Sequence, residues 1–242
     1  IMPIQIGARD VAFPKLNLFS WYLYITGALL AVTSLFTGGG PPDTGWTFYV
    51  PFSAQTSTNV SLAAVAVFIL GFSSILTGLN FVTTIHRLRT KGMTWMRLPF
   101  FVWAMLVTGF LLLLSFPPLE VAGIMQVVDR MFGSSFFQPS GLYHQQIGLA
   151  DASGGGSPLL YQHLFWFLGH PEVYVLLLPA IACVAEIIPV NTRRPIWGYK
   201  SMVYGVLVLG FLSFIVWAHH MYMTGMGPAI STFFQTTTTL IS

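Results

Sequence analysis

The stretch Trp166-Phe-Leu-Gly-His170-Pro-Glu172-Val-Tyr174 places a histidine, a carboxylic acid and a phenol within a long apolar run. A charged side chain at the centre of a bilayer costs at least ~2.5–3.5 kcal/mol by insertion scales, so such residues indicate function. On a helix, His170 and Tyr174 lie four residues apart and share a face. Glu172 is turned away from both by roughly 200°. The segment therefore predicts a ligand-bearing face and, separately, an acid for proton transfer.

Composition predicts an integral membrane protein. Of the 242 residues, 55% are hydrophobic and 7% are charged, whereas soluble domains carry about 25% charged residues. A helix needs ~20 apolar residues to cross a ~30 Å hydrocarbon core. We expect an all-α, polytopic transmembrane helix bundle with about five complete spans and the start of a sixth. The predicted spans cover residues 16–36, 60–85, 100–126, 160–189 and 201–221, and the sixth begins near Pro228.

The loops predict the orientation of the spans. Nine of the ten Lys and Arg residues precede the first span, follow the second or follow the fourth, and Arg130 alone lies on the other side. The positive-inside rule makes the nine-residue side cytoplasmic. We expect residues 1–15 on the cytoplasmic side of a bacterial inner membrane. Since the sequence opens on Ile1 and stops within a helical pattern, we also expect residues 1–242 to be an internal fragment, truncated at both ends, of one longer domain.

A second polar element, Val216-Trp-Ala-His219-His220-Met221-Tyr222, ends the fifth predicted span. Counted at ~1.5 Å per residue, it falls at a depth similar to that of His170, in the outer half of the membrane. Neutral imidazoles suit copper, zinc or iron, and a nitrogen-only site leaning to tetragonal geometry favours copper. The alternative is that His219 and His220 are hydrogen-bonded interface residues. We favour copper because three imidazoles at matched depth lie beside Tyr174.

The remaining polar residues of the spans leave two interpretations open. Glu172 has no Lys or Arg near it within the spans, and an unpaired carboxyl in apolar surroundings favours its protonated form, the form of a proton donor. We favour a relay over a structural acid. Asp10, taken alone, is a solvated loop charge. A set of polar span residues lines a wet path or packs helices together, and periodicity alone favours packing: Asn17, Ser20, Ser73, Ser74 and Asn80.

Two motifs together, His170-Pro-Glu172-Val-Tyr174 and Trp217-Ala-His219-His220-Met221, resemble the copper-site motifs of the large catalytic subunit, subunit I, of haem–copper oxygen reductases. This family contains the cytochrome c oxidases and related quinol oxidases. Shorter matches extend the resemblance along nearly the whole chain: Gly7-Ala-Arg-Asp10-Val-Ala-Phe-Pro14, Gly45-Trp46-Thr, Ser73-Ser74-Ile-Leu and Tyr161-Gln-His163-Leu-Phe-Trp166. The resemblance implies part of a fold of about twelve helices, from roughly the third to the eighth.

The resemblance implies a terminal oxidase that reduces O2 to water at a haem–copper centre and pumps protons. It implies that the three histidines of the two motifs bind copper facing a high-spin haem. It also implies a covalent bond between His170 and Tyr174, with Tyr174 supplying an electron and a proton. Trp166 would flank the copper, and Trp46, otherwise an interfacial aromatic, would lie near a haem propionate. A proton path would end at Glu172, and its implied members are Asp10, Asn17, Ser73, Ser74 and Asn80. We add Ser20 because it lies near the cytoplasmic end of the first span.

The resemblance further implies copper and two haems as cofactors, with the haem axial ligands outside this sequence. The implied partners are subunits II and III, cytochrome c or quinol as electron donor, O2 and the lipid bilayer, and nucleic acid is not among them. Two departures from the family pattern concern donor and subunit docking: the long 127–158 loop and the segment Gly227-Pro-Ala-Ile-Ser231. One alternative is a nitric oxide reductase with iron in place of copper, against which Tyr174 and Glu172 argue. The other is a metal- or proton-coupled transporter.

Overall fold

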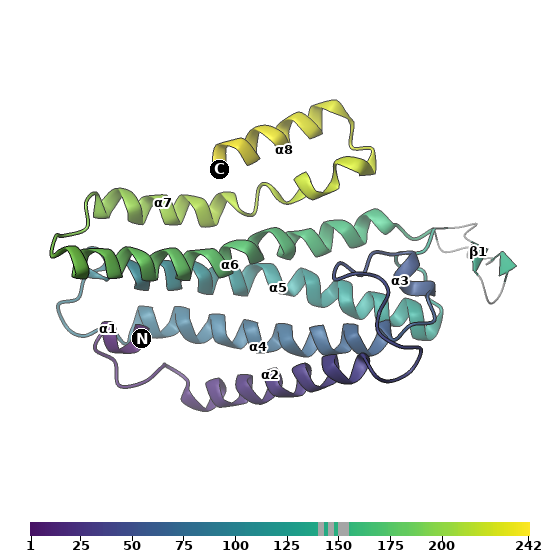
Figure 1. The fold of residues 1–242 in the computed structure, drawn as a ribbon, viewed down its shortest axis with the longest axis horizontal. Helices are drawn as coiled ribbons and strands as arrows, with labels where there is room; N and C mark the ends of the chain where they lie inside the picture. The colour runs from purple at the N-terminus through teal and green to yellow at the C-terminus, as the bar shows by residue number, and fades with distance from the viewer. Residues whose placement is uncertain (140–142, 145–147, 150–154) are drawn as a thin grey trace. The chain divides into compact units, whose positions relative to one another are not determined.

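The computed structural model describes residues 1–139, 143–144, 148–149 and 155–242 (Figure 1). Two pairs of residues, β1 (Tyr143–His144) and β2 (Gly148–Leu149), form a short antiparallel ladder. Apart from this ladder, the regular structure of the described residues is helical. The α-helices are α1 (Met2–Gln5), α2 (Pro14–Ser34), α3 (Phe52–Gln55), α4 (Val60–Arg87), α5 (Phe100–Phe132), α6 (Pro158–Thr192), α7 (Tyr199–Leu212) and α8 (Gly227–Ile241), and the 3-10 helices are η1 (Trp95–Arg97) and η2 (Trp217–Thr224).

Five helical segments are long and apolar enough to cross a membrane, which confirms the predicted all-α, multi-span class. They are Pro14–Ser34, Val60–Arg87, Phe100–Phe132, Pro158–Thr192 and Tyr199–Thr224. The loop expected from residue 127 begins only after Phe132, so its predicted start is wrong. Helix α5 continues further because the polar side chains of its last turns have hydrogen-bond partners. Residues 141–146 of the long loop lie largely outside the described residues.

We expected the fifth span to be one continuous helix over residues 201–221, but the structure shows that it is interrupted. Helix α7 ends at Leu212 and η2 begins at Trp217, with Met221 in a non-helical conformation at φ −122° and ψ 19°. Ser213 is fully buried just after α7, and its hydroxyl donates to the Gly210 carbonyl at 2.7 Å. A serine that occupies a helix carbonyl in this way competes with continuation of the helix. The break precedes the two adjacent histidines and sets their orientation.

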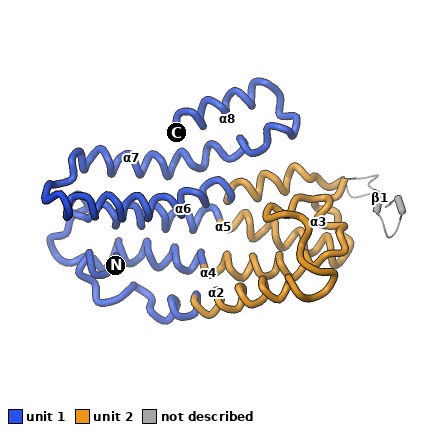
Figure 2. Tube along the Cα trace, in the orientation of Figure 1, with its two compact units in different colours: residues 1–20, 74–115, 169–242 blue, residues 21–73, 116–168 orange. Residues whose placement is uncertain are grey.

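Contacts divide the chain into two compact units (Figure 2). Unit 1 contains residues 1–20, 74–115 and 169–242. The first half of α5 forms its centre, with residues 100–107 buried against apolar side chains of α1, α4, α6 and α7. Helix α7 approaches α5 closely at Gly210, where an added β-carbon would lie 2.4 Å from a methyl carbon of Val107. Glycine is therefore required for this contact.

Unit 2 contains residues 21–73 and 116–168. Its loop between α2 and α4 is attached to α5 by Arg130. The guanidinium donates to the Ser61 hydroxyl at 3.0 Å, the Ser53 carbonyl at 2.8 Å and the Thr58 carbonyl at 2.6 Å. The start of α6 contacts the same loop, because the Tyr161 hydroxyl donates to the Thr47 carbonyl at 2.9 Å. The loop is thus held in place by polar side chains of two spans.

Candidate functional site

Three histidines converge in unit 1, His170 from α6 and His219 and His220 from η2. Nδ1 of His170 lies 3.4 Å from Nε2 of His220, and Nε2 of His219 lies 3.0 Å from the same atom. One nitrogen of each ring is within 4.8 Å of the others. Within the described residues, this is the only group of three or more His, Cys, Asp or Glu side chains arranged to hold a metal ion.

The rings of both η2 histidines lie at the same point. Adjacent side chains on a straight α-helix are turned ~100° from each other, which separates their ring nitrogens. Here the rings of His219 and His220 have centroids 4.2 Å apart, and that of His219 lies 4.5 Å from the ring of His170. The two imidazoles therefore converge through their side-chain conformations, although adjacent residues of a 3-10 helix are also turned apart, by ~120°.

Thr238 of α8 fixes the tautomer of His219. The Thr238 hydroxyl donates to the Phe234 carbonyl at 2.6 Å, and its oxygen lies 2.8 Å from Nδ1 of His219. Because the hydroxyl proton is already used, the oxygen accepts and the imidazole proton resides on Nδ1. Nε2 of His219 then keeps its lone pair for the centre of the cluster. Metal-binding imidazoles are commonly oriented by such an outer hydrogen bond.

The donor set of the cluster fits copper. Imidazole nitrogens that bind one ion at ~2.0–2.1 Å lie roughly 3–4 Å from each other. Two of the three observed separations, 3.0 and 3.4 Å, are in this range, and the third is within 4.8 Å. Neutral imidazole is a suitable ligand for copper as well as for zinc, iron and nickel. The residues that would hold the ion are therefore His170 through Nδ1 and His219 and His220 through Nε2.

The second nitrogen of His170 has no role within the cluster. Nε2 is buried and lacks a hydrogen-bond partner among the described residues. Buried polar atoms without partners are rare and require an explanation. The ring of Tyr174, one turn further along α6, has its centroid 5.1 Å from that of His170, with the planes 58° apart. Tyr174 is thus the phenol beside the histidine cluster, while Glu172, between the two in sequence, is half-buried.

The two predicted cofactor-contacting tryptophans meet in unit 2. The rings of Trp46 and Trp166 are in an edge-to-face contact, with centroids 5.6 Å apart and planes at 88°. Nε1 of Trp166 donates to the Tyr49 hydroxyl at 2.5 Å. Trp46 is 64% exposed, so much of its surface is available for a further contact. Their predicted positions beside copper and a haem propionate stay predictions.

Asn80 has a clear packing role among the predicted proton-path residues. Its fully buried amide accepts from the Phe13 N–H at 2.9 Å and donates to the Phe13 carbonyl at 3.1 Å. It thereby fixes the N-terminal segment against α4, which is the alternative that sequence left open. Asp10, on the same segment, is exposed and accepts from the Val11 N–H at 2.7 Å.

The other path residues lie on α2 and α4. The Ser20 hydroxyl donates to the carbonyl of Asn17 in its own helix at 2.8 Å. Ser73 is buried and Ser74 is partly buried. Ser73 belongs to unit 2, whereas Asn17, Ser20 and Ser74 belong to unit 1.

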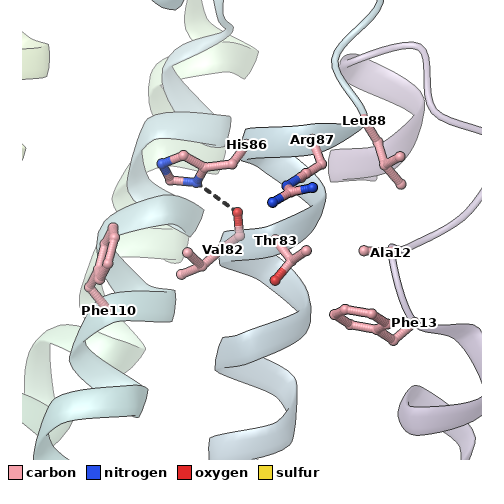
Figure 3. A pocket seen from close by; sticks show the side chains of 8 residues that line it. All are labelled: Ala12, Phe13, Val82, Thr83, His86, Arg87, Leu88 and Phe110. Atoms are coloured by element: carbon pink, nitrogen blue, oxygen red, sulfur yellow. Dashed lines mark hydrogen bonds between the residues drawn. The ribbon is translucent and has the colours of Figure 1, made fainter.

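A pocket of about 590 Å³ lies beside the N-terminal segment in unit 1 (Figure 3). Its lining contains none of the predicted copper ligands, and its first lining residue, Ala12, is two residues after Asp10. Nδ1 of His86, on its wall, donates to the Val82 carbonyl of the same helix at 2.8 Å. The lining is mostly apolar and consists of Ala12, Phe13, Val82, Thr83, His86, Arg87, Leu88 and Phe110.

Glu120 is a functional candidate that the histidine motifs do not reveal. It lies inside α5, is 6% exposed, and neither carboxyl oxygen has a hydrogen-bond partner among the described residues. The available signal was the acid itself, in Pro117-Pro118-Leu-Glu120 within an apolar span.

Helical spans and a cluster of three histidines define the class, a multi-span membrane protein with a candidate metal site. All 242 residues match the sequence profile described as cytochrome c and quinol oxidase polypeptide I, and the chain belongs to this family. The resemblance carried by the two histidine motifs is thereby confirmed.

Individual relatives also support membership in this family. Over its full length the chain is 43% identical to the alternative cytochrome c oxidase subunit 1 of Bradyrhizobium diazoefficiens, covering 41% of that protein. It is 43% identical to cytochrome c oxidase subunit 1 of Cereibacter sphaeroides, again covering 41%. It is 40% identical to the heme-copper oxidase subunit I+III of Aeropyrum pernix, covering 28%. The chain thus spans well under half the length of these relatives.

Proposed function

We propose that the chain is part of subunit I of a terminal oxidase that reduces O2 to water at a haem–copper centre and pumps protons. The observation that carries the proposal is the convergence of His170, His219 and His220 in a member of this family. Residues 1–242 would account for part of the subunit I domain. These residues alone are expected to show no oxidase activity, because the implied haem ligands lie elsewhere.

The three histidines would hold one copper ion, which when bound supplies a redox-active centre for oxygen chemistry. His220 is exposed in this chain, so the cluster is open on its side. A haem would face the copper ion. We propose two haems in the whole protein, with Trp46 near a propionate and Trp166 beside the copper.

Tyr174 would supply a hydrogen atom during O–O cleavage. The unpartnered Nε2 of His170 and the neighbouring phenol ring support a covalent bond between the two residues. Forming this bond removes two hydrogens, an oxidation for which the oxidase's own oxygen chemistry supplies the oxidant. Peptide mass spectrometry of the active enzyme should therefore find the two peptides joined and lighter by two hydrogens. Finding only separate peptides in active enzyme would contradict the bond.

Protons would reach Glu172 from the cytoplasmic side. Fourteen residues of α6 separate Glu172 from Glu186, or ~21 Å, so one hop cannot connect them. Waters need polar partners, and these would be Asn17, Ser20, Ser73, Ser74 and Asn80, with Asp10 as the entrance. Asp10→Asn should slow proton uptake and turnover with metals retained, and Glu172→Gln should stop turnover. Normal turnover and pumping in Asp10→Asn would return Asp10 to a solvated loop charge.

The orientation follows from the positive-inside rule, with residues 1–15 in the cytoplasm of a bacterial cell and the spans in its inner membrane. We propose subunits II and III as partners and cytochrome c or quinol as electron donor. The Aeropyrum pernix relative, named subunit I+III, supports the association with subunit III.

The test is oxygen consumption by the full-length protein, with metal analysis and haem spectra on the same sample. We expect O2 reduction, copper and haem bands. Iron in place of copper, with nitric oxide reduction, would support the nitric oxide reductase alternative. Transport without haem bands or redox activity would support the transporter.

A further inference from the structure

Glu120 occupies a space that only glycine leaves open. Its Oε1 atom would lie 1.5 Å from a β-carbon added at Gly71 of α4, and the same β-carbon would lie 3.1 Å from the ring of Phe116. Both residues belong to unit 2 together with Glu120. The carboxyl group is thus enclosed between α4 and α5, with no partner for either oxygen among the described residues.

Charged side chains are distant from Glu120 along the helices that enclose it. On α5 the nearest are Asp129 and Arg130, nine and ten residues away, or ~14–15 Å. An isolated ionised carboxyl in an apolar interior is far more costly than a neutral one. On α4, which contacts Glu120 at Gly71, the titratable groups are His86 and Arg87, fifteen and sixteen residues after Gly71, or ~22–24 Å along the helix.

We propose that Glu120 is a proton-binding site in the membrane interior, separate from Glu172, that exchanges its proton with the membrane side at the C-terminal end of α5. The carboxylic acid releases its proton to water and becomes a carboxylate, and it regains a proton by the reverse step. No copper or haem is needed for this exchange, so the site stands whether or not the chain is an oxidase.

A hydrogen-bonded network leads from this end of α5 to the surface. The Gln126 amide, which is buried, donates to the Ser53 hydroxyl at 2.5 Å. The carbonyl of Ser53 accepts from Arg130 at 2.8 Å, and Arg130 also donates to the Thr58 carbonyl at 2.6 Å. The Thr58 hydroxyl donates to Asp43, an exposed carboxylate, at 2.8 Å. Groups of this kind can hold a file of waters.

Water must bridge the ~9 Å along α5 between Glu120 and Gln126. Gly123 lies between them, and a β-carbon there would have no heavy atom of the described residues within 4 Å. This side of the helix therefore has room for water. At the surface, Asp43 offsets the charge of Arg130, which would otherwise oppose a passing proton.

Infrared difference spectroscopy of the full-length protein in lipid bilayers tests the protonation state. At neutral pH the wild type should show a carboxylic C=O band that shifts in deuterated water and is lost in Glu120→Gln. Glu172→Gln should remove a different band, if any. If Glu120→Gln removes a carboxylate band instead, Glu120 is ionised and paired with a cation from elsewhere in the assembly, which overturns the proposal.

The route is tested by the rate at which the Glu120 band exchanges with deuterium. Gln126→Leu should keep the band and slow its exchange about tenfold, as expected when one hydrogen-bonding group for water is removed. Gln235→Leu, an exposed site on α8, is the matched control and should leave the rate unchanged. Equal exchange in both variants would refute this route. Copper content, measured on the same samples, separates these outcomes from failure of the proposed oxidase function.

Discussion

The histidine cluster of unit 1 and the Arg130 network of unit 2 differ in whether their polar groups have matching hydrogen-bond partners. At Arg130 each donor meets a carbonyl or hydroxyl oxygen, at 2.6–3.0 Å. In the cluster, imidazole nitrogens face one another at 3.0 and 3.4 Å. His219 has no proton to offer there, because Thr238 holds it on the other nitrogen.

The difference distinguishes a network that supports the fold from a cluster that could bind a metal ion. A network whose donors and acceptors match is complete without a ligand and attaches a loop to a helix. A set of imidazole nitrogens that face one another can be completed by a cation. We therefore expect loss of the Arg130 guanidinium to alter stability and changes at the histidine cluster to alter metal binding or turnover.

Among the variants that compare the histidine cluster with the Arg130 network, the largest effect is expected for Tyr174→Phe. Loss of the phenol removes a proton donor, so turnover should fall ~10²–10⁴-fold, while the unfolding temperature stays near that of the wild type. Oxygen consumption and thermal unfolding of the full-length protein measure both. Tyr222→Phe, on the exposed side of η2, is the control. Wild-type turnover in Tyr174→Phe would refute the assigned role.

Arg130→Met should lower the free energy of unfolding by about 3 kcal/mol or more, because bonds from a charged donor contribute ~1.5–3 kcal/mol each. Denaturant unfolding in detergent measures this loss. Copper per folded protein should not change. Arg194→Met, at an exposed loop site, should have little effect. Copper loss without loss of stability in Arg130→Met would reverse the comparison.

Thr238→Val should weaken copper binding ~10–100-fold, the usual effect of removing an outer partner of a metal-bound histidine. Thr238→Ser should preserve the affinity. The neighbouring Thr237, whose hydroxyl bonds only to carbonyls of α8 among the contacts described, offers a matched control in Thr237→Val. Equal copper affinity in Thr238→Val and wild type would show that Thr238 does not orient His219.

The smallest effect concerns pH and Asp43. The Thr58 hydroxyl holds the pKa of Asp43 below its usual value. A lowered folded pKa stabilises the fold above the unfolded pKa of ~3.9, and the contribution is lost as pH falls through the folded pKa. The stability difference between wild type and Asp43→Asn should therefore be present at neutral pH and shrink below about pH 4. A difference that does not depend on pH would contradict this linkage.

Hydropathy was sufficient to predict the spans, because lipid requires long apolar helices with internal hydrogen bonds. Helix rise alone placed His170 at the depth of His219 and His220. The break after Leu212 escaped prediction because Ser213-Phe-Ile-Val216 contains neither Gly nor Pro. The burial of Ser213, which accompanies the break, depends on tertiary packing that the sequence does not show.

Two further residues show why side-chain roles resist prediction. From the sequence, Asn80 could line a proton path or pack helices together. The structure shows its amide hydrogen-bonded to the backbone of Phe13. Glu120 is visible as an acid in a span, but its enclosure depends on Gly71, forty-nine residues earlier. Such pairings depend on helix register, which composition and periodicity do not specify.

The most direct test of the copper site is metal analysis of the full-length protein with His170, His219 or His220 changed to alanine. Haem spectra on the same samples report whether the protein is intact, and His86→Ala, whose imidazole bonds to its own helix, serves as the matched control. We predict that each of the three variants loses copper and keeps haem, while His86→Ala retains one copper per chain. Stoichiometric copper in all three alanine variants would contradict the site.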